Sequence, residues 1–226
     1  MATPLPFDGR PSGCPVFLAP ASRLRLIDKR TRRDHSCLEA DDVCFYYGEY
    51  VAGAGIKTPT NDLILDLKKE PARRGKYDWR YKVWAIEDCA RVLRLGLDIA
   101  RLEGVTLVPV PPSKRRDHRA YDDRMLQVVR ALCGGTRLDW RELLVATRSR
   151  RPRHGDQGSS TIEVLKMALE VNAKCSAPGP SRILLFDDVL TSGATFKACQ
   201  AVLRAAFPRV EVAGCFVARR VIQPFN

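Results

Sequence analysis

Residues 183–195 read Ile-Leu-Leu-Phe-Asp-Asp-Val-Leu-Thr-Ser-Gly-Ala-Thr. A run of large apolar residues stops at two adjacent carboxylates, Asp187 and Asp188. Small hydroxyl residues follow around a glycine, and a helical pattern starts at Phe196. Short apolar runs of this kind are typical of buried parallel strands, whose carboxyl ends form ligand crevices. The stretch therefore predicts a strand, a site at its end, an anion-binding turn and a helix.

The chemistry of this stretch suits a phosphorylated sugar. Backbone N–H groups at a helix start attract an anion, and hydroxyl groups in the turn add donors around it. Asp187 and Asp188 would then face sugar hydroxyls or the water shell of a magnesium ion. A signalling receiver domain is a weaker alternative, because roughly forty residues remain after the acidic pair, too few for its further units. A plain structural turn is the other alternative, although two acids on a buried strand cost free energy unless they have partners.

The stretch closely resembles the motif with which type I phosphoribosyltransferases bind phosphoribosyl pyrophosphate. That motif has four apolar residues, two acids, an apolar residue, a variable residue and then Thr-Thr/Ser-Gly-Ala-Thr. The resemblance implies Mg²⁺-dependent transfer of a phosphoribosyl group to a nitrogen nucleophile, a nucleobase or an amine, with release of pyrophosphate. It implies that Asp187 and Asp188 bind the ribose and the metal. The residues implied for the 5′-phosphate are Leu190, Thr191, Ser192, Gly193, Ala194 and Thr195.

A second candidate site loop follows the apolar, β-branched run Val105–Val110. Its sequence, Pro111-Pro112-Ser113-Lys114-Arg115-Arg116, combines a rigid backbone with cations, which suits a diphosphate. In the resembled family, pyrophosphate binds to the loop after the first core strand. The run Pro109-Val110-Pro111 is similar to a Pro-Val-Pro loop of the ComF branch of that family. In that branch the sequence Arg-Gly-Phe-Asn-Gln follows downstream, and this chain has Arg119-Ala-Tyr-Asp-Asp at the corresponding place. The residues implied for pyrophosphate are Pro112, Ser113, Lys114, Arg115 and Arg119.

A third candidate is the long, charged loop expected over Thr147–Ser160. Loops of this length inside a domain are usually functional or disordered. In the resembled family a mobile catalytic loop closes over the substrate at this place, and arginines followed by Gln157 match a ComF-like pattern. The spacing from Gln157 to Asn172 is a few residues longer than that pattern. The catalytic candidates are Arg148, Arg150, Arg151, Arg153 and His154, the last as a proton shuttle.

The remaining periodicity predicts an α/β chain. We expect a doubly wound parallel sheet of the type I phosphoribosyltransferase kind with an N-terminal extension or hood subdomain. Residues 1–80 would form an arm and hood, and residues 81–226 the core. The glycines at 53–55 lack the third glycine of a dinucleotide fingerprint and precede Pro59, which favours a hairpin or loop. The other expected strands are Val43–Val51, Leu143–Ala146 and Val210–Ala218, and the expected helices are Asn61–Lys69, Trp84–Leu97, Met125–Leu132, Ile162–Val171 and Phe196–Phe207.

Composition limits the class of protein and of partner. The 226 residues suffice for one substantial core, and 45% hydrophobic with 28% charged residues are globular values. The eight cysteines form no Cys-x-x-Cys pair, and no apolar run nears membrane-spanning length, so a soluble cytoplasmic protein is expected.

The net charge of +12 favours anionic partners, either nucleic acid or a small polyphosphate. It leaves open a non-catalytic alternative, a phosphoribosyl pyrophosphate sensor that binds nucleic acid. The acceptor is not identified by the sequence: Tyr46 and Tyr47 could stack on a base, or could simply alternate on a half-buried strand. A homodimer, and a partner chain that completes the acceptor site, are also left open.

Overall fold

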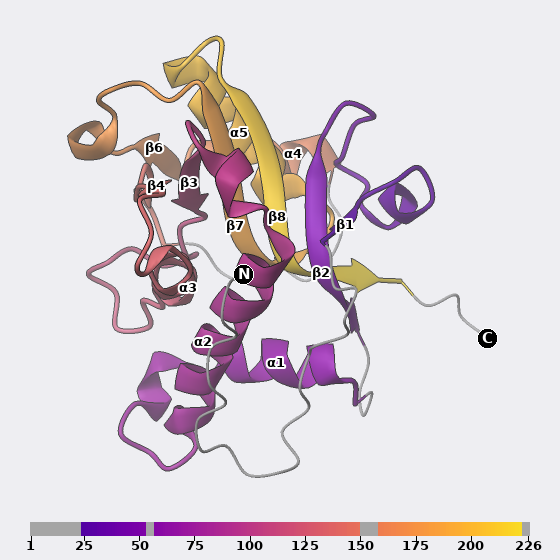
Figure 1. Ribbon diagram of the computed structural model, residues 1–226, viewed down its shortest axis with the longest axis vertical. Helices are drawn as coiled ribbons and strands as arrows, with labels where there is room; N and C mark the ends of the chain where they lie inside the picture. Colours follow the sequence, from indigo (N-terminus) through magenta and orange to yellow (C-terminus); the bar gives the residue numbers. More distant parts are fainter. Residues whose placement is uncertain (1–23, 53–56, 150–157, 223–226) are drawn as a thin grey trace.

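The computed structural model describes residues 24–52, 57–149 and 158–222. Its centre is a six-stranded sheet in the order β1-β2-β8-β7-β3-β4, which Figure 1 shows running from β1 at the right to β4 at the left. All neighbours in this sheet are parallel except β1, which is antiparallel to β2. The expected α/β class with a mostly parallel sheet is therefore confirmed. The strand bounds are β1 Arg25–Leu26, β2 Cys44–Val51, β3 Thr106–Pro109, β4 Asp139–Trp140, β7 Arg182–Leu190 and β8 Glu211–Val221.

The middle strand β7 shows how the sheet divides two apolar cores. Ile183 and Leu185 lie in one core cluster, and Leu184 and Phe186 lie in the other, as the twofold period of a strand requires. Because both faces of β7 are covered, nearly every residue of the strand is buried. α1, α2 and α3 pack on the Leu184 face, and α5 packs on the Leu185 face. The helix bounds are α1 Pro59–Leu67, α2 Trp79–Gly96, α3 Arg124–Cys133, α4 Gly158–Lys166 and α5 Ala194–Ala206.

Two helices on one face of the sheet begin earlier in the sequence than expected. α1 begins at Pro59, whose fixed φ suits the first helical position, and the hydroxyl of Thr58 accepts the N–H of Asn61. Asn61 was expected to be the first residue of this helix. Its side chain instead bonds both backbone groups of Val51 and ties α1 to β2. α2 begins at Trp79 rather than Trp84, and its buried face begins with Lys82, one turn before Ile86.

The helix expected over Ile162–Val171 is wrong in its second half. α4 ends at Lys166, and β6 follows at Leu169–Val171. β6 pairs antiparallel with β5, Leu144–Ala146, in a separate two-stranded sheet. Leu169 and Leu144 are both buried in the core on the α5 side, so tertiary pairing overrides the local helical pattern. The strand expected at residues 143–146 is confirmed, but it stands outside the main sheet.

The motif strand is longer than its apolar run. β7 continues through Asp187 and Asp188 to Leu190, because its backbone groups pair with β8 along that whole length. The acidic pair was expected to follow the strand, whereas it lies within β7. α5 begins at Ala194 instead of Phe196, so only Thr191–Gly193 separate strand from helix. A turn this short leaves the site little conformational freedom.

The N-terminal region contributes strands to the main sheet. β2 lies between β1 and β8, and Tyr46 is buried in the core with the guanidinium groups of Arg25 and Arg219 over its ring. Tyr46 therefore alternates into the sheet and is not exposed for stacking, whereas Tyr47 is half-buried. The domain boundary near residue 80 stays a prediction.

No helix in the described ranges is both long enough and apolar enough to cross a membrane. The cysteines in those ranges form no disulfide; they are Cys37, Cys44, Cys89, Cys133, Cys175, Cys199 and Cys215.

Candidate functional site

The candidate site lies where the sheet reverses its winding. β3 and β7 are parallel neighbours with adjacent carboxyl ends, and the N–H of Val110 bonds the carbonyl of Phe186. From β3 the chain continues to α3 on one face, whereas from β7 it continues to α5 on the other. In open α/β sheets, ligands bind outside the carboxyl ends of the strands at such a switch point. The topology thus brings together the acidic pair and the loop that begins at Pro111.

Asp188 is held by two cations. Its Oδ2 lies 2.8 Å from Nε and 2.6 Å from Nη2 of Arg124, the first residue of α3. Its Oδ1 lies 3.3 Å from Nζ of Lys68 and accepts the N–H of Val189. Burial would raise the pKa of Asp188, but Arg124 and Lys68 outweigh burial and hold that pKa below its usual range. Asp188 is thus a buried carboxylate with its oxygens already occupied.

Asp187 has a different environment. It is half-buried, and its Oδ1 accepts the backbone N–H of Asp188 at 2.8 Å. Burial and the neighbouring charge of Asp188 raise the pKa of Asp187 to about 7. Among the described residues, none forms a direct ion pair with Asp187. Its carboxylate is therefore the one of the pair that has capacity left for a ligand.

The turn after β7 has the backbone of an anion cradle. Gly193 has φ of 89°, a left-handed conformation that L side chains rarely adopt, and it caps the start of α5. Thr191 is exposed and Ser192 and Thr195 are half-buried, so their side chains are accessible around the helix start. N–H groups at the start of a helix of this length attract anions. The turn thus combines a left-handed glycine, a helix start and accessible hydroxyls, and its role as a phosphate cradle stays a prediction.

Residues 35–38, from the N-terminal region, pack against this turn. The buried His35 contacts the carbonyl oxygen of Thr191 through Nδ1, and the N–H of Cys37 donates to the carbonyl of Ser192 at 2.8 Å. A Cβ on Gly193 would lie only 2.7 Å from Cδ2 of Leu38. Burial lowers the pKa of His35, so its imidazole is neutral in the folded protein near pH 7. The contacts of His35 and Cys37 thus hold the carbonyl oxygens of Thr191 and Ser192 on the side of the turn that faces residues 35–38. We call residues 35–38 the turn support.

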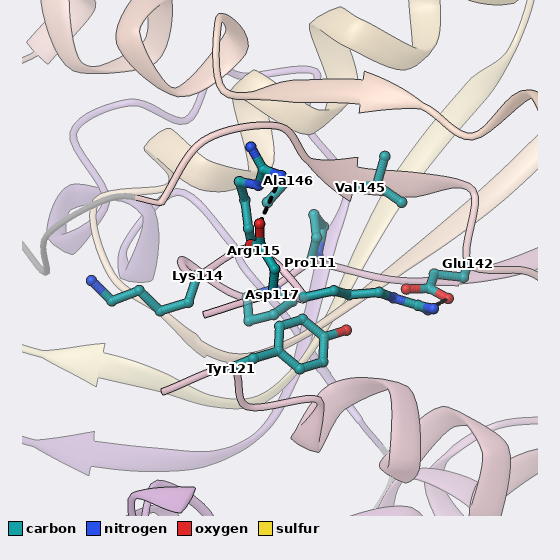
Figure 2. A pocket seen from close by; sticks show the side chains of 10 residues that line it. Pro111, Lys114, Arg115, Asp117, Tyr121, Glu142, Val145 and Ala146 are labelled. Carbon is teal, nitrogen blue, oxygen red and sulfur yellow. Dashed lines mark hydrogen bonds and ion pairs between the residues drawn. The ribbon is translucent and has the colours of Figure 1, made fainter. Parts of the chain in front are cut away.

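The Pro111–Arg116 loop borders a hollow of about 220 Å³. In Figure 2, Lys114 and Glu142 lie at opposite ends of this hollow, with the Tyr121 ring along one side. Arg115 pairs with Asp117 at 2.9 Å, and Arg116 pairs with Glu142. Three candidate groups, Pro112, Lys114 and Arg115, thus share one hollow, while Ser113 and Arg119 do not line it. Asp187 and Asp188 do not line it either, so this hollow does not include the acidic pair.

The third candidate loop is only partly described. Arg148 is exposed just after β5, and the N–H of Arg115 donates to Oγ of Ser149 at 3.2 Å. The loop therefore starts beside the Pro111–Arg116 loop. β5 precedes the loop and α4 follows it, and β6, after α4, pairs antiparallel with β5. Arg150, Arg151, Arg153, His154 and Gln157, like the arm at residues 1–20 and the glycine loop at 53–56, lie outside the described residues.

Sequence reasoning missed the cations around the acidic pair. Lys68 lies in the expected helix Asn61–Lys69, whereas Lys82 and Arg124 lie just before the expected helices Trp84–Leu97 and Met125–Leu132. Asp122, which pairs with two of these cations, lies in the run that is similar to the ComF branch, and none of the four was expected to contact the acidic pair. Lys82 could have been noticed, because it falls among the apolar positions of α2 and is 1% exposed. A lysine on a buried helix face predicts a buried carboxylate partner. The sequence offers no comparable signal for Lys68.

The donor set fits a magnesium ion that keeps most of its water. One half-buried carboxylate, from Asp187, matches the preference of Mg²⁺ for few protein oxygens, with substrate phosphates as further ligands. Asp188 can take part only by releasing a cation. A separate acidic cluster, Glu39, Asp41 and Asp42, has oxygens within 4.8 Å of one another, but Asp42 is already bound by Lys197 and Gln200.

Comparison with known proteins adds no assignment to this site. No protein-family model matches the chain, and no curated protein matches it.

Proposed function

We propose that this chain binds phosphoribosyl pyrophosphate with Mg²⁺ and transfers its phosphoribosyl group to a nitrogen nucleophile, releasing pyrophosphate. The observation that carries the proposal is the end of β7: a half-buried carboxylate, Asp187, is followed within a few residues by the left-handed Gly193 and the start of α5. A sugar hydroxyl and a phosphate on the same ligand match this spacing. The parallel neighbour β3 leads into a cationic loop, which matches a second phosphate group on the same ligand.

Each part of the substrate has a counterpart in this arrangement. The turn Thr191–Thr195 would hold the 5′-phosphate through backbone N–H groups and hydroxyls. The Asp187 carboxylate would accept hydrogen bonds from the ribose hydroxyls and hold a hydrated magnesium ion, which supplies positive charge to the diphosphate when bound. Lys114 and Arg115 would contact the diphosphate. These placements set the anomeric carbon between the acidic pair and the Pro111–Arg116 loop.

The charge arrangement matches the demands of the transfer step. The bond from the anomeric carbon to the diphosphate breaks with its electron pair on oxygen, and the acceptor nitrogen forms the new bond and loses a proton. By analogy with glycoside chemistry, positive charge develops on the ribose ring and negative charge on the diphosphate. Asp187 lies on the ribose side and the cations lie on the diphosphate side, so both charges are opposed by fixed groups. Preorganised charges of this kind contribute several kcal/mol to a barrier.

Calorimetry and a product assay test the proposal. Phosphoribosyl pyrophosphate should bind in the presence of Mg²⁺, and pyrophosphate should be released when one of a panel of nucleobases, orotate and ammonia donors is added. Binding without release for any acceptor would restrict the chain to a binding role. Absence of binding would refute the proposal.

The charge of the chain favours a second candidate, a phosphoribosyl pyrophosphate sensor that binds nucleic acid. Arg115, Arg116, Arg119 and Arg148 are all exposed on the loops around the site, and the net charge is +12. Affinity for single-stranded or duplex DNA would then fall steeply with salt and change when phosphoribosyl pyrophosphate is added. Pyrophosphate release without such binding would favour the enzyme.

A further inference from the structure

The two carboxylates of the acidic pair have unequal surroundings. Asp188 is 5% exposed, and both of its oxygens lie within ion-pair distance of a cation, Arg124 or Lys68. Asp187 is half-buried, and within the described ranges its oxygens accept only a backbone N–H. Asp187 and Asp188 are consecutive residues of β7, so their side chains point to opposite faces of the sheet and contact different elements. This difference in access is consistent with different roles for the two acids, one structural and one in ligand binding.

Arg124 is itself fixed by a second layer of charges. Its Nη1 donates to Oδ2 of Asp122 at 2.6 Å, so one guanidinium joins two buried carboxylates. Oδ2 of Asp122 also accepts from Nζ of Lys82 at 2.8 Å. A planar guanidinium carries its donors in a rigid fork, so it can hold two acids at a defined separation. The position of Asp188 is therefore set from α3.

Lys82 extends the same network to α1. Its ammonium donates to the carbonyls of Leu67 and Lys69 at 2.8 Å each, in addition to Asp122, so its three N–H groups all have acceptors. These carbonyls flank Lys68, the residue that reaches Oδ1 of Asp188. Both cations on Asp188 are thus positioned by Lys82 and Asp122. We call Lys68, Lys82, Asp122 and Arg124 the anchoring network.

We propose that the anchoring network makes Asp188 a fixed structural anion, with Arg124 as the positioning residue, and leaves Asp187 as the acid of the pair that binds ribose hydroxyls and hydrated magnesium. This inference rests on the proposed function for the identity of the ligand. Its structural half, the anchoring of Asp188, does not depend on that identity. The two halves can therefore be tested separately.

Four variants separate an anchor from a ligand. Asp187→Asn should weaken the binding of Mg²⁺ and phosphoribosyl pyrophosphate at least about 10-fold, since hydrogen bonds to a charged acceptor are lost, while the urea midpoint is retained. Asp188→Asn and Arg124→Gln should each lower the urea midpoint, because each removes one of the ion-pair partners of a buried charge. Arg124→Gln with Asp188→Asn removes both charges of the pair. This double variant should bind phosphoribosyl pyrophosphate within about 3-fold of the unmodified protein and unfold at a higher urea concentration than either single variant.

Arg101→Gln is the matched control, because Arg101 and Asp98 form a pair at 3.1 Å that is largely exposed. It should change neither affinity nor the urea midpoint. If the double variant binds as weakly as Asp187→Asn, Asp188 is a direct ligand and the division of labour is refuted. Unchanged urea midpoints for both Asp188→Asn and Arg124→Gln would refute the anchor. If the unmodified protein does not bind phosphoribosyl pyrophosphate, the proposed function fails, and the urea midpoints still decide the anchoring of Asp188.

Discussion

Replacing Gly193 with alanine tests the turn that joins β7 to α5. Gly193 has φ of 89°, and an added Cβ would lie 2.7 Å from Cδ2 and 2.9 Å from Cγ of Leu38. Two penalties follow. Holding alanine in a left-handed conformation costs about 1–2 kcal/mol, and forcing a methyl group against a packed side chain costs about 1–3 kcal/mol. Gly193→Ala should therefore lower the free energy of unfolding by about 2–5 kcal/mol.

Gly75 provides a matched control for the first penalty alone. Its φ is 83°, close to that of Gly193, but an added Cβ would meet nothing within 4 Å. Gly75→Ala should therefore cost only about 1–2 kcal/mol. The difference between the two variants in urea denaturation, with the slope m unchanged, measures the contact with Leu38.

A functional readout goes with the stability measurement. Because the turn must shift when the methyl group enters, affinity for ribose 5-phosphate should fall about 10-fold in Gly193→Ala, and should stay unchanged in Gly75→Ala. Equal losses of stability in both variants would show that Leu38 does not pack against the turn. A loss below about 0.5 kcal/mol for Gly193→Ala would refute the left-handed conformation itself.

Three further predictions concern other parts of the site. Lys82→Met removes the donor shared by Asp122 and the carbonyls of Leu67 and Lys69. It should lower the free energy of unfolding, measured by urea denaturation, by about 3–5 kcal/mol. A loss below about 1 kcal/mol would contradict the anchoring network. The pKa of His35 lies below its ordinary value of 6.5 in the folded protein, so the unfolded chain binds the proton more readily. The free energy of unfolding should therefore fall as the pH drops below about 6.5. His35→Gln should lessen that pH dependence, which thermal unfolding from pH 7.5 to pH 5 would measure. The double variant Lys114→Gln and Arg115→Gln should weaken pyrophosphate binding in calorimetry by about 10-fold or more. Lys174→Gln, at an exposed position, is the control and should leave that binding unchanged. Equal effects of the double variant and the control would assign the binding to net charge alone.

The sequence predicted those features that depend on local pattern. The buried strand at Ile183, the turn glycine at 193 and the strand before Pro111 follow from apolar runs and turn residues, and the structure has each of them. β6 was missed because Leu169 pairs with Ala146, a partner distant in sequence. The occupation of Asp188 was missed for the same reason, because Lys68 and Arg124 reach it from α1 and α3. Local periodicity cannot report contacts that only tertiary packing creates.

Both edges of the main sheet end in very short strands. β1 and β4 are two residues each, and Arg25 on β1 lies over the Tyr46 ring and 3.7 Å from Glu49. An edge this short, with a charged side chain folded across it, offers few unpaired backbone groups to another chain. Two copies of this protein would thus gain little by pairing through β1 or β4. Any homodimer should instead meet through helix or loop surfaces, and its contacts should depend on side chains and not on backbone pairing.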